Sequence, residues 1–159
     1  MNNKINTVCK VEGSYETLSY LNSILSDNRF SDLFISSSEM EDFDVDDFEI
    51  TFKTLDEFTE ITMYLSSEDT PPLNAMEYLY NHLVETNNDQ SVVMEGEYYN
   101  YDYSELGVFA VSDSDGMFTE EDSPIMSQEE YVEEYDDDFY FENEIRPTLD
   151  DMKKKIFAY

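Results

Sequence analysis

No lysine or arginine occurs between Lys53 and Arg146, and this gap limits what the chain can fold into. The 92 residues 54–145 contain 26 Asp and Glu, with His82 as the one side chain among them that could carry a positive charge. Soluble domains usually intersperse both signs of charge, so that surface side chains pair locally. Local pairing cannot occur here, so the sequence predicts carboxylates that face water or an external cation.

The rest of the composition favours a folded chain. Over 159 residues, 39 Asp and Glu stand against 8 Lys and Arg, a formal charge of −31. Strong acidity with little apolar surface is typical of disorder, because burial then cannot offset the conformational entropy of folding. This chain has 13 Tyr and 11 Phe, and aliphatic residues recur throughout. We expect one domain with a real core, or one domain with a short appendage.

Cys9 is the one cysteine of the sequence, so no disulfide can form within the chain. A buried thiol in a cytoplasmic protein is the expected role. The opening segment MNNKINTVCKVEG lacks the apolar stretch of a signal peptide, and no apolar run reaches the roughly 18 residues that span a bilayer. We therefore expect neither secretion nor a membrane partner.

Periodicity predicts strand and helix in the first half of the chain. Residues 4–12 alternate as a strand, and residues 14–28 have apolar positions three and four apart, as in a helix. Residues 36–47 are expected to form an acidic loop and residues 48–55 a strand. Residues 56–66 could form a helix with Phe58, Ile61 and Leu65 on one side, but a strand at 60–66 is favoured. The apolar stripe expected on the helix consists of Tyr15, Leu18, Leu21, Ile24 and Leu25.

A second helix is predicted after the proline pair, with Pro72 in its first turn. Two strands should follow, at residues 91–99 and 105–112. The second helix is expected to bury Leu73, Met76, Leu79, Tyr80 and Leu83.

The C-terminal segment TLDDMKKKIFAY predicts a closing helix that Thr148 caps. Its apolar stripe would be Leu149, Met152 and Ile156, and the acids near its start and the lysines near its end suit the helix dipole. Lys153, Lys154 and Lys155 are interpreted as structural.

These elements predict an α+β fold of ferredoxin-like kind, an antiparallel-rich sheet with helices on one face. Residues 1–116 would form this domain. Residues 117–159 would form an acidic, aromatic-rich C-terminal extension that ends in the short helix.

Three segments resemble the ferredoxin-like YubB-type domain of plasmid and phage proteins. They are the opening strand NTVCKVEG, the segment TPPLNAMEYLYNHL with its proline pair before a helix, and GEYYNYDYSELGVF. Asp69 and Thr70 stand where that family has an aromatic residue before the prolines. The resemblance covers roughly residues 4–116 and implies the fold and a mobile-element origin, but no catalytic residues.

The residues suggest no enzyme. Paired Asp and Glu are too numerous for any pair to stand out as acid and base, and nothing near His82 marks a nucleophile. The 4 glycines include no phosphate-cradling cluster, so no cofactor is expected. Direct nucleic-acid binding requires a basic face and is also excluded.

A calcium loop is a partial match. In VSDSDGMFTEED, Asp113, Asp115, Gly116 and Asp122 fall at the third, fifth, sixth and twelfth places of the EF-hand spacing, but Val111 stands first, where a ligand is required. A tight turn at residues 115–116 is the favoured interpretation, and no metal site is predicted. Weak divalent-cation binding to clustered carboxylates stays open.

The amount of charge matches that of duplex DNA. At about one charge per 1.7 Å of axis, 31 charges correspond to roughly 50 Å of duplex, and a domain of this length is about 40 Å across. Acids two apart on a strand, such as Glu95 and Glu97, lie about 6.6 Å apart, and i,i+4 helical pairs such as Glu129 and Glu133 about 6 Å apart. Both spacings resemble neighbouring phosphates.

The sequence therefore predicts a DNA mimic, encoded by a phage or plasmid, that enters the DNA-binding cleft of a basic defence protein such as a restriction or CRISPR nuclease in the bacterial cytoplasm. An acidic adaptor or chaperone that shields a basic partner is the alternative, and a homodimer stays open. The carboxylates expected to contact the partner are Glu39, Glu41, Asp42, Asp44, Asp46, Asp47, Glu95, Glu97, Glu120, Glu121, Asp122, Glu129, Glu130, Glu133, Glu134, Asp136, Asp137, Asp138, Glu142 and Glu144.

Overall fold

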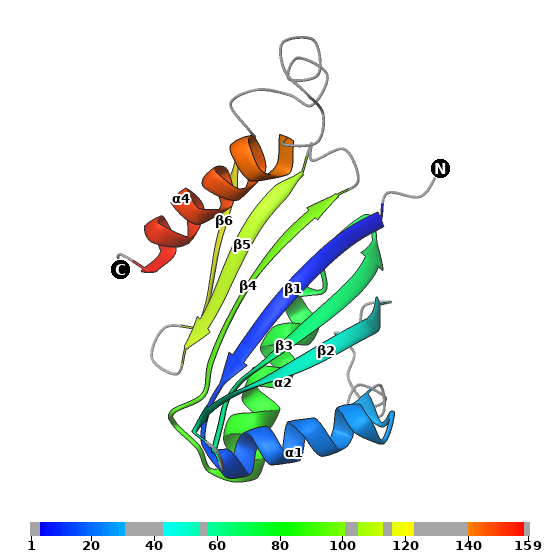
Figure 1. The fold of residues 1–159 in the computed structure, drawn as a ribbon, viewed down its shortest axis with the longest axis vertical. Helices are drawn as coiled ribbons and strands as arrows, with labels where there is room; N and C mark the ends of the chain where they lie inside the picture. The colour runs from blue at the N-terminus through cyan, green and yellow to red at the C-terminus, as the bar shows by residue number, and fades with distance from the viewer. Residues whose placement is uncertain are drawn as a thin grey trace.

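The computed structural model describes residues 4–30, 43–54, 57–100, 105–112, 116–122 and 140–157. Its strands and helices are shown in Figure 1. They are β1 (Lys4–Glu12), α1 (Tyr15–Ser26), β2 (Phe43–Thr54), β3 (Glu57–Glu68), α2 (Leu73–Asn87), β4 (Val93–Asn100), β5 (Leu106–Ser112), β6 (Gly116–Asp122), the wide helical turn η3 (Phe141–Ile145) and α4 (Arg146–Phe157).

The six strands form one sheet in the order β2-β3-β1-β4-β5-β6. Every neighbouring pair is antiparallel. This confirms an α+β fold with an antiparallel sheet. The central strand β1 pairs with β3 on one side and with β4 on the other. The predicted strands 4–12, 60–66, 91–99 and 105–112 are confirmed within a few residues.

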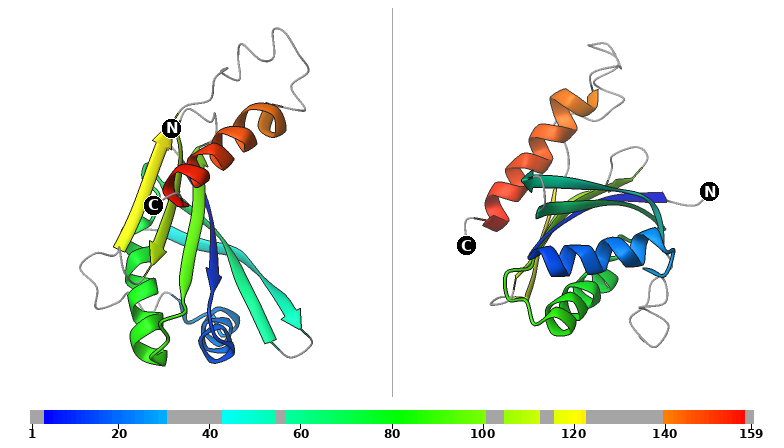
Figure 2. Two further views of the ribbon diagram at one scale, coloured as in Figure 1. Left: turned by 90° about the vertical axis from the view of Figure 1, so that its left-hand side faces the viewer. Right: turned by 60° about the horizontal axis from the view of Figure 1, so that its bottom comes forward.

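One face of the sheet packs on α1 and α2 (Figure 2). Alternate residues of β1 point into this core, where Ile5, Cys9 and Val11 are fully buried. The same alternation buries Ile61 and Met63 of β3, because antiparallel register partners share a face.

The predicted first helix is confirmed as α1. Ser14 caps it, since the Ser14 side chain accepts a hydrogen bond from the backbone N–H of Thr17. Leu18 and Leu21 are fully buried, as their spacing predicts. Tyr15 is an exception to the predicted stripe, because its side chain is 54% exposed.

The predicted second helix is confirmed as α2, although Pro72 is the residue before the helix and not part of its first turn. Its core-facing residues follow the predicted spacing. Asn88 ends the helix in a left-handed conformation with φ of 47°. The residues that α2 buries are Ala75, Met76, Leu79, Tyr80, Leu83 and Val84.

Asp89, just after α2, forms hydrogen bonds to the start of α1. Its Oδ2 accepts hydrogen bonds from Ser14 N at 3.0 Å and from Thr17 Oγ1 at 2.7 Å, and its Oδ1 accepts from Ser91 N at 2.9 Å. Burial alone would raise the pKa of Asp89, but the hydrogen bonds from Ser91, Thr17 and Ser14 outweigh burial and hold that pKa below its usual value. One carboxylate thus fastens the start of α1 to the chain that leaves α2.

A second helical layer lies on the opposite face, where α4 crosses β5 and β6 (Figures 1 and 2). Its core is separate from the first and includes Leu106, Val108 and Ala110 of β5 together with Leu149 and Met152 of α4. The expectation that helices cover one face is therefore wrong. The structure has helices on both faces, because β5 is apolar on both of its sides.

Three boundaries differ from the sequence expectation. Strand β2 begins at Phe43, so the end of the expected acidic loop is strand. Residues 116–122, assigned to the turn and the start of the extension, form the edge strand β6 beside β5. Because β6 and α4 pack with the sheet, these parts of the expected extension belong to the same folded unit.

The last helix also begins earlier than predicted. Thr148 is not its cap, because the Thr148 hydroxyl donates to the carbonyl of Glu144 within the helix at 2.7 Å. Pro147 has no backbone N–H, and the turn before it is wide, with the N–H of Arg146 donating to the carbonyl of Phe141. Leu149 and Met152 are buried as predicted.

Within the described residues, none of the helices combines the length and apolarity that crossing a bilayer requires.

Candidate acidic interaction face

Polar and acidic side chains gather on the sheet face opposite α1 and α2, over the strands that α4 leaves uncovered. In register across β2 and β3, Asp44 lies opposite Ser66, Asp47 opposite Tyr64, and Glu49 opposite Thr62. We call this surface the acidic sheet face and define it by the carboxylates of Glu12, Asp44, Asp46, Asp47, Glu49, Glu60, Glu68 and Glu95.

An irregularity in β2 increases the charge of this face. The register between β2 and β3 shifts between Val45 and Asp47, which is a β-bulge. Asp46 Oδ1 accepts a hydrogen bond from Ser66 Oγ at 3.1 Å, and Asp47 is the register partner of Tyr64. Since residues 64 and 66 of β3 share a face, the bulge places two successive carboxylates on the same side.

Tyr64 lies among these carboxylates. Its hydroxyl donates to Glu49 Oε2 at 3.1 Å. The pKa of Tyr64 is raised, first by partial burial, then by its hydrogen bond to Glu49 and by the negative charges of Glu49 and Asp47. The negative charges around Tyr64 thus favour the neutral form of its phenol.

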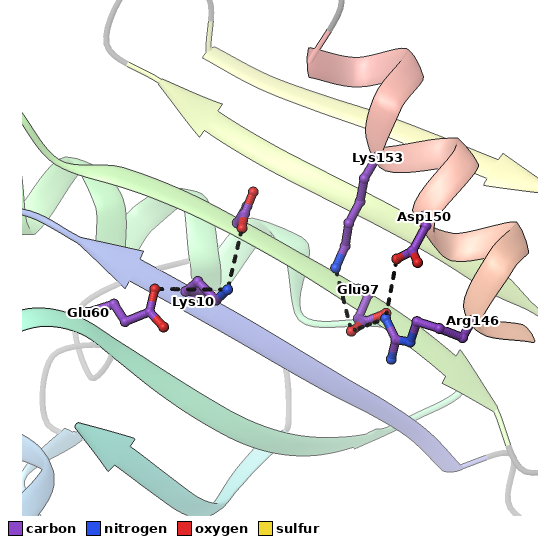
Figure 3. Close-up of polar contacts among 7 residues, drawn as sticks. Lys10, Glu60, Glu97, Arg146, Asp150 and Lys153 are labelled. Carbon is purple, nitrogen blue, oxygen red and sulfur yellow. Dashed lines mark hydrogen bonds and ion pairs between the residues drawn. The ribbon is translucent and has the colours of Figure 1, made fainter. Parts of the chain in front are cut away.

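Lys10 is the cation in the middle of the face. Its Nζ lies 3.9 Å from Glu60 Oε2 and 3.9 Å from Glu95 Oε1 (Figure 3). These distances are long and the side chains remain partly exposed, so the pairs contribute little to stability. Glu60 and Glu95 nevertheless face an internal cation, which corrects the expectation that carboxylates of residues 54–145 face water or an external one.

Glu97 is not part of an exposed surface, and its predicted role as a phosphate mimic is wrong. Glu97 is only 6% exposed. Arg146 Nη1 donates to Glu97 Oε1 at 3.0 Å and to Oε2 at 2.7 Å, while Lys153 Nζ lies 3.6 Å from Oε1. Figure 3 shows both cations reaching Glu97 from α4. Glu97 therefore forms ion pairs within the protein. These pairs matter because an unpaired buried charge would be destabilising.

The surroundings of Arg146 complete this ion cluster. Its guanidinium lies 5.2 Å from the centre of the Phe141 ring, and Nη1 lies 3.7 Å from Asp150 Oδ1. Burial would lower the pKa of Arg146, but the hydrogen bond and charge of Glu97, followed by the charges of Asp150 and Tyr99, raise it. Lys153 is structural, as predicted.

The helical side of the molecule carries fewer acids than the acidic sheet face. Glu16 is the one acidic residue within α1, and α2 contains Glu77 and Glu85. Asp89 on this side is used in internal hydrogen bonds. The helices α1 and α2 thus carry fewer carboxylates than the acidic sheet face, which also contains Lys4 and Lys10.

The structure places some predicted contact residues and leaves others outside its description. Asp44, Asp46, Asp47 and Glu95 lie on the acidic sheet face. Glu142 and Glu144 lie on η3, with Glu142 exposed and Glu144 half-buried. The β6 strand contains Glu120, Glu121 and Asp122. The remaining predicted residues lie outside the described residues: Glu39, Glu41, Asp42, Glu129, Glu130, Glu133, Glu134, Asp136, Asp137 and Asp138.

Sequence reasoning missed Glu12, Glu60 and Glu68 as members of this face. A signal existed in residues 60–68, where polar residues alternate with Ile61, Met63 and Leu65. Alternation in a strand that is covered on one side assigns the polar positions to the other side.

The described residues of the partial calcium-loop match lie in strands β5 and β6. Gly116 and Asp122 are the two ends of strand β6, which places them about 20 Å apart. Asp113 and Asp115 lie outside the described residues. Among the residues that are described, no group of three or more His, Cys, Asp or Glu side chains could hold a metal ion.

The chain was compared with models of known protein families, with curated proteins and with solved structures, and none of the three comparisons gave a match.

Proposed function

We propose that this protein is a non-enzymatic DNA mimic that inhibits a basic, DNA-binding protein by placing carboxylates where the DNA phosphates would bind. The observation that carries the proposal is the acidic sheet face. Asp44, Asp46, Asp47 and Glu49 are exposed on one strand, on a side that no helix of the described chain covers.

The spacing of these carboxylates supports mimicry. Residues two apart on a strand are separated by about 6.6 Å, and neighbouring strands by about 4.8 Å. Backbone hydrogen bonds to β3 and the bonds from Ser66 and Tyr64 fix the acids of β2 in place. A rigid anionic lattice loses little conformational entropy when a partner binds, unlike a flexible acidic tail.

Electrostatics supports the same proposal. Like charges crowded on one face repel one another, and a cleft of Lys and Arg would relieve that repulsion on binding. A partner already arranged for phosphates would gain rapid association, and the complex would weaken as salt increases. We propose a nuclease of a bacterial defence system, of restriction or CRISPR type, as the target.

The fold is compatible with the proposed origin. The order β1-α1-β2-β3-α2-β4, with the sheet order β2-β3-β1-β4 in that part of the chain, supports a ferredoxin-like assignment. We propose the same kind of domain as in YubB-type proteins of plasmids and phages, extended here by β5, β6 and α4.

The test is capture followed by competition. The tagged protein is used to retain partners from a bacterial lysate, the retained proteins are eluted with salt and identified, and one purified partner is titrated with labelled duplex DNA and this protein together. Mimicry requires that the two ligands exclude each other. A ternary complex of partner, DNA and this protein would instead indicate an adaptor or chaperone and would contradict the proposal.

A matched pair of variants assigns the surface. Glu49→Gln/Glu68→Gln removes two charges from the acidic sheet face, and Glu16→Gln/Glu85→Gln removes two from the helical side. At about 0.2–1 kcal/mol for each exposed pair, the first variant should weaken binding about 2- to 30-fold. The second should leave binding nearly unchanged, and equal effects of both would mean that total charge, and not this face, binds the partner.

A further inference from the structure

The sheet already binds a helix with cationic side chains on the face that carries the acids. Glu97 lies two residues from Glu95 on β4 and opposite Val8 on β1, so its side chain is on the same side of the sheet as the acidic sheet face. On that side α4 packs over β5 and β6 and sends Arg146 and Lys153 to Glu97. The protein itself therefore shows how a helix can dock on this surface.

The part of this face that none of the described helices covers has the width of one more helix. It consists of β1, β3 and β2, which are consecutive in the sheet. Three strands at about 4.8 Å spacing give a strip roughly 10–14 Å wide, and an α-helix with its side chains is about 10–12 Å in diameter. Figure 1 looks onto this strip, with α4 beside it.

The residues across the strip suit an amphipathic helix. In one register row, Asp47 lies opposite Tyr64, and Tyr64 opposite Val8. Tyr64 and Val8 are half-buried, so the centre of the row offers apolar contact. Asp47 stands at the outer margin with Asp44 and Glu49. A helix with an apolar stripe and basic residues on the side that faces β2 would match this arrangement.

We propose that the partner docks a basic amphipathic α-helix on β1, β3 and β2, alongside α4. Its apolar stripe packs on Tyr64 and Val8, and its Arg and Lys side chains pair with the acids of β2, as Arg146 and Lys153 pair with Glu97. This inference rests on the proposed function and narrows it, because the target then belongs to the proteins that read DNA with a helix in the major groove.

A peptide pair tests the preference for a helix. One probe is a stapled amphipathic peptide with a Leu stripe and Arg along one side of that stripe. The other peptide has the same amino-acid composition but no staple, and the order of its residues is changed so that it stays extended. The stapled peptide should bind about tenfold more tightly, since pre-ordering lowers the entropic cost of binding. It should also shift the amide resonances of Lys10, Thr62 and Tyr64. Equal affinities, or shifts centred on α1, would overturn the inference.

A variant pair controls for charge. Thr62→Arg places a bulky cation in the middle of the strip, and Ser23→Arg places the same side chain on exposed α1. The first should weaken binding of the stapled peptide by about tenfold or more, because it adds a clash and like-charge repulsion. The second should change it less than about twofold. If Thr62→Arg does not fold, Glu49→Lys on β2 is tested in its place. Equal losses in the substituted proteins would contradict docking on the strip.

Failure of this inference can be told apart from failure of the proposed function. If the captured partner excludes DNA but the protein shows no preference for the stapled peptide, the mimic binds something other than a helix. If partner, DNA and this protein form a ternary complex, mimicry itself is wrong, whatever the peptides do.

Discussion

Arg146 uses one nitrogen, Nη1, to contact both carboxylate oxygens of Glu97, at 3.0 Å and 2.7 Å, although 49 positions separate the two residues in the chain. This contact fixes α4 against β4. It also removes one carboxylate from the outer surface, since Glu97 lies beneath Arg146 and Lys153. Arg146 and Lys153, which follow the long acidic segment, are thus part of the fold.

Replacing Arg146 should destabilise the protein. Arg146→Met keeps most of the side-chain volume but leaves Glu97 with Lys153 alone, at a longer distance. Hydrogen bonds to charged groups contribute about 1.5–3 kcal/mol, so we expect a loss of about that size in the free energy of unfolding, measured by urea titration. Asp150→Asn is the control, because Asp150 is 52% exposed and 3.7 Å from the guanidinium, and it should change stability by less than about 0.5 kcal/mol. Equal losses of stability in the two variants would mean that the contact with Glu97 contributes no more than the contact with Asp150.

Truncating the α4 core should have a larger effect. Leu149 is fully buried against β5, so Leu149→Ala should reduce the free energy of unfolding by about 2–5 kcal/mol. The control is Asp151→Ala on the exposed side of the same helix. Amide exchange in β5 should also increase in Leu149→Ala. A stable Leu149→Ala protein with unchanged β5 exchange would show that α4 is a dispensable appendage.

Gly96 is predicted to tolerate no side chain. A Cβ at this position would lie 2.6 Å from the backbone oxygen of Val8 and would also clash with the ring of Phe109. Gly96→Ala should therefore cost about 1–3 kcal/mol in thermal or urea unfolding. The double variant Gly96→Ala/Phe109→Leu should not restore full stability, because the backbone of Val8 cannot move aside. Full rescue would show that Phe109 alone limits the space.

Asp89 should stabilise the fold in a pH-dependent manner. Its folded-state pKa lies below the ordinary value of 3.8, so its contribution is present above that value and is lost as the pH falls through the folded-state pKa. Asp89→Asn should therefore be less stable than the parent by about 1–3 kcal/mol at pH 7, and this difference should shrink below about pH 4. Urea titrations at several pH values measure it.

The control for this pH dependence is Glu85→Gln, which removes an exposed carboxylate from α2. Its stability should follow that of the parent protein across the same pH range. A difference between Asp89→Asn and the parent that does not vary with pH would show that Asp89 acts through shape and not through its charge.

Local patterns predicted the part of the fold that α1, α2 and β1 form. Their apolar residues recur with one clear period, and Ser14 marks the start of α1, so sequence alone placed them. The first four strands were also predictable, because each alternates between apolar and polar residues. Alternation does not predict the order of the strands in the sheet, because that order depends on contacts between residues distant in sequence.

The second helical layer was missed, although β5 contained a signal for it. In LGVFAVS, Leu106 and Val108 on one side and Phe109 and Val111 on the other are all apolar, which is typical of a strand buried on both faces. Strand β6 was not predicted, because it ends in consecutive acidic residues that do not alternate with apolar ones. The pairing of Glu97 with Arg146 could not be predicted, because it depends on where α4 lies across the sheet.

Cys9 determines how this protein can be studied. It is the one cysteine in the sequence, it is fully buried, and burial followed by the charge of Glu95 raises the pKa of its thiol. Such a thiol reacts slowly with alkylating agents while the protein is folded. A cysteine introduced at Thr62 could therefore carry a fluorophore or cross-linker without removal of the native residue, and labelling of Cys9 itself would measure how often the sheet opens.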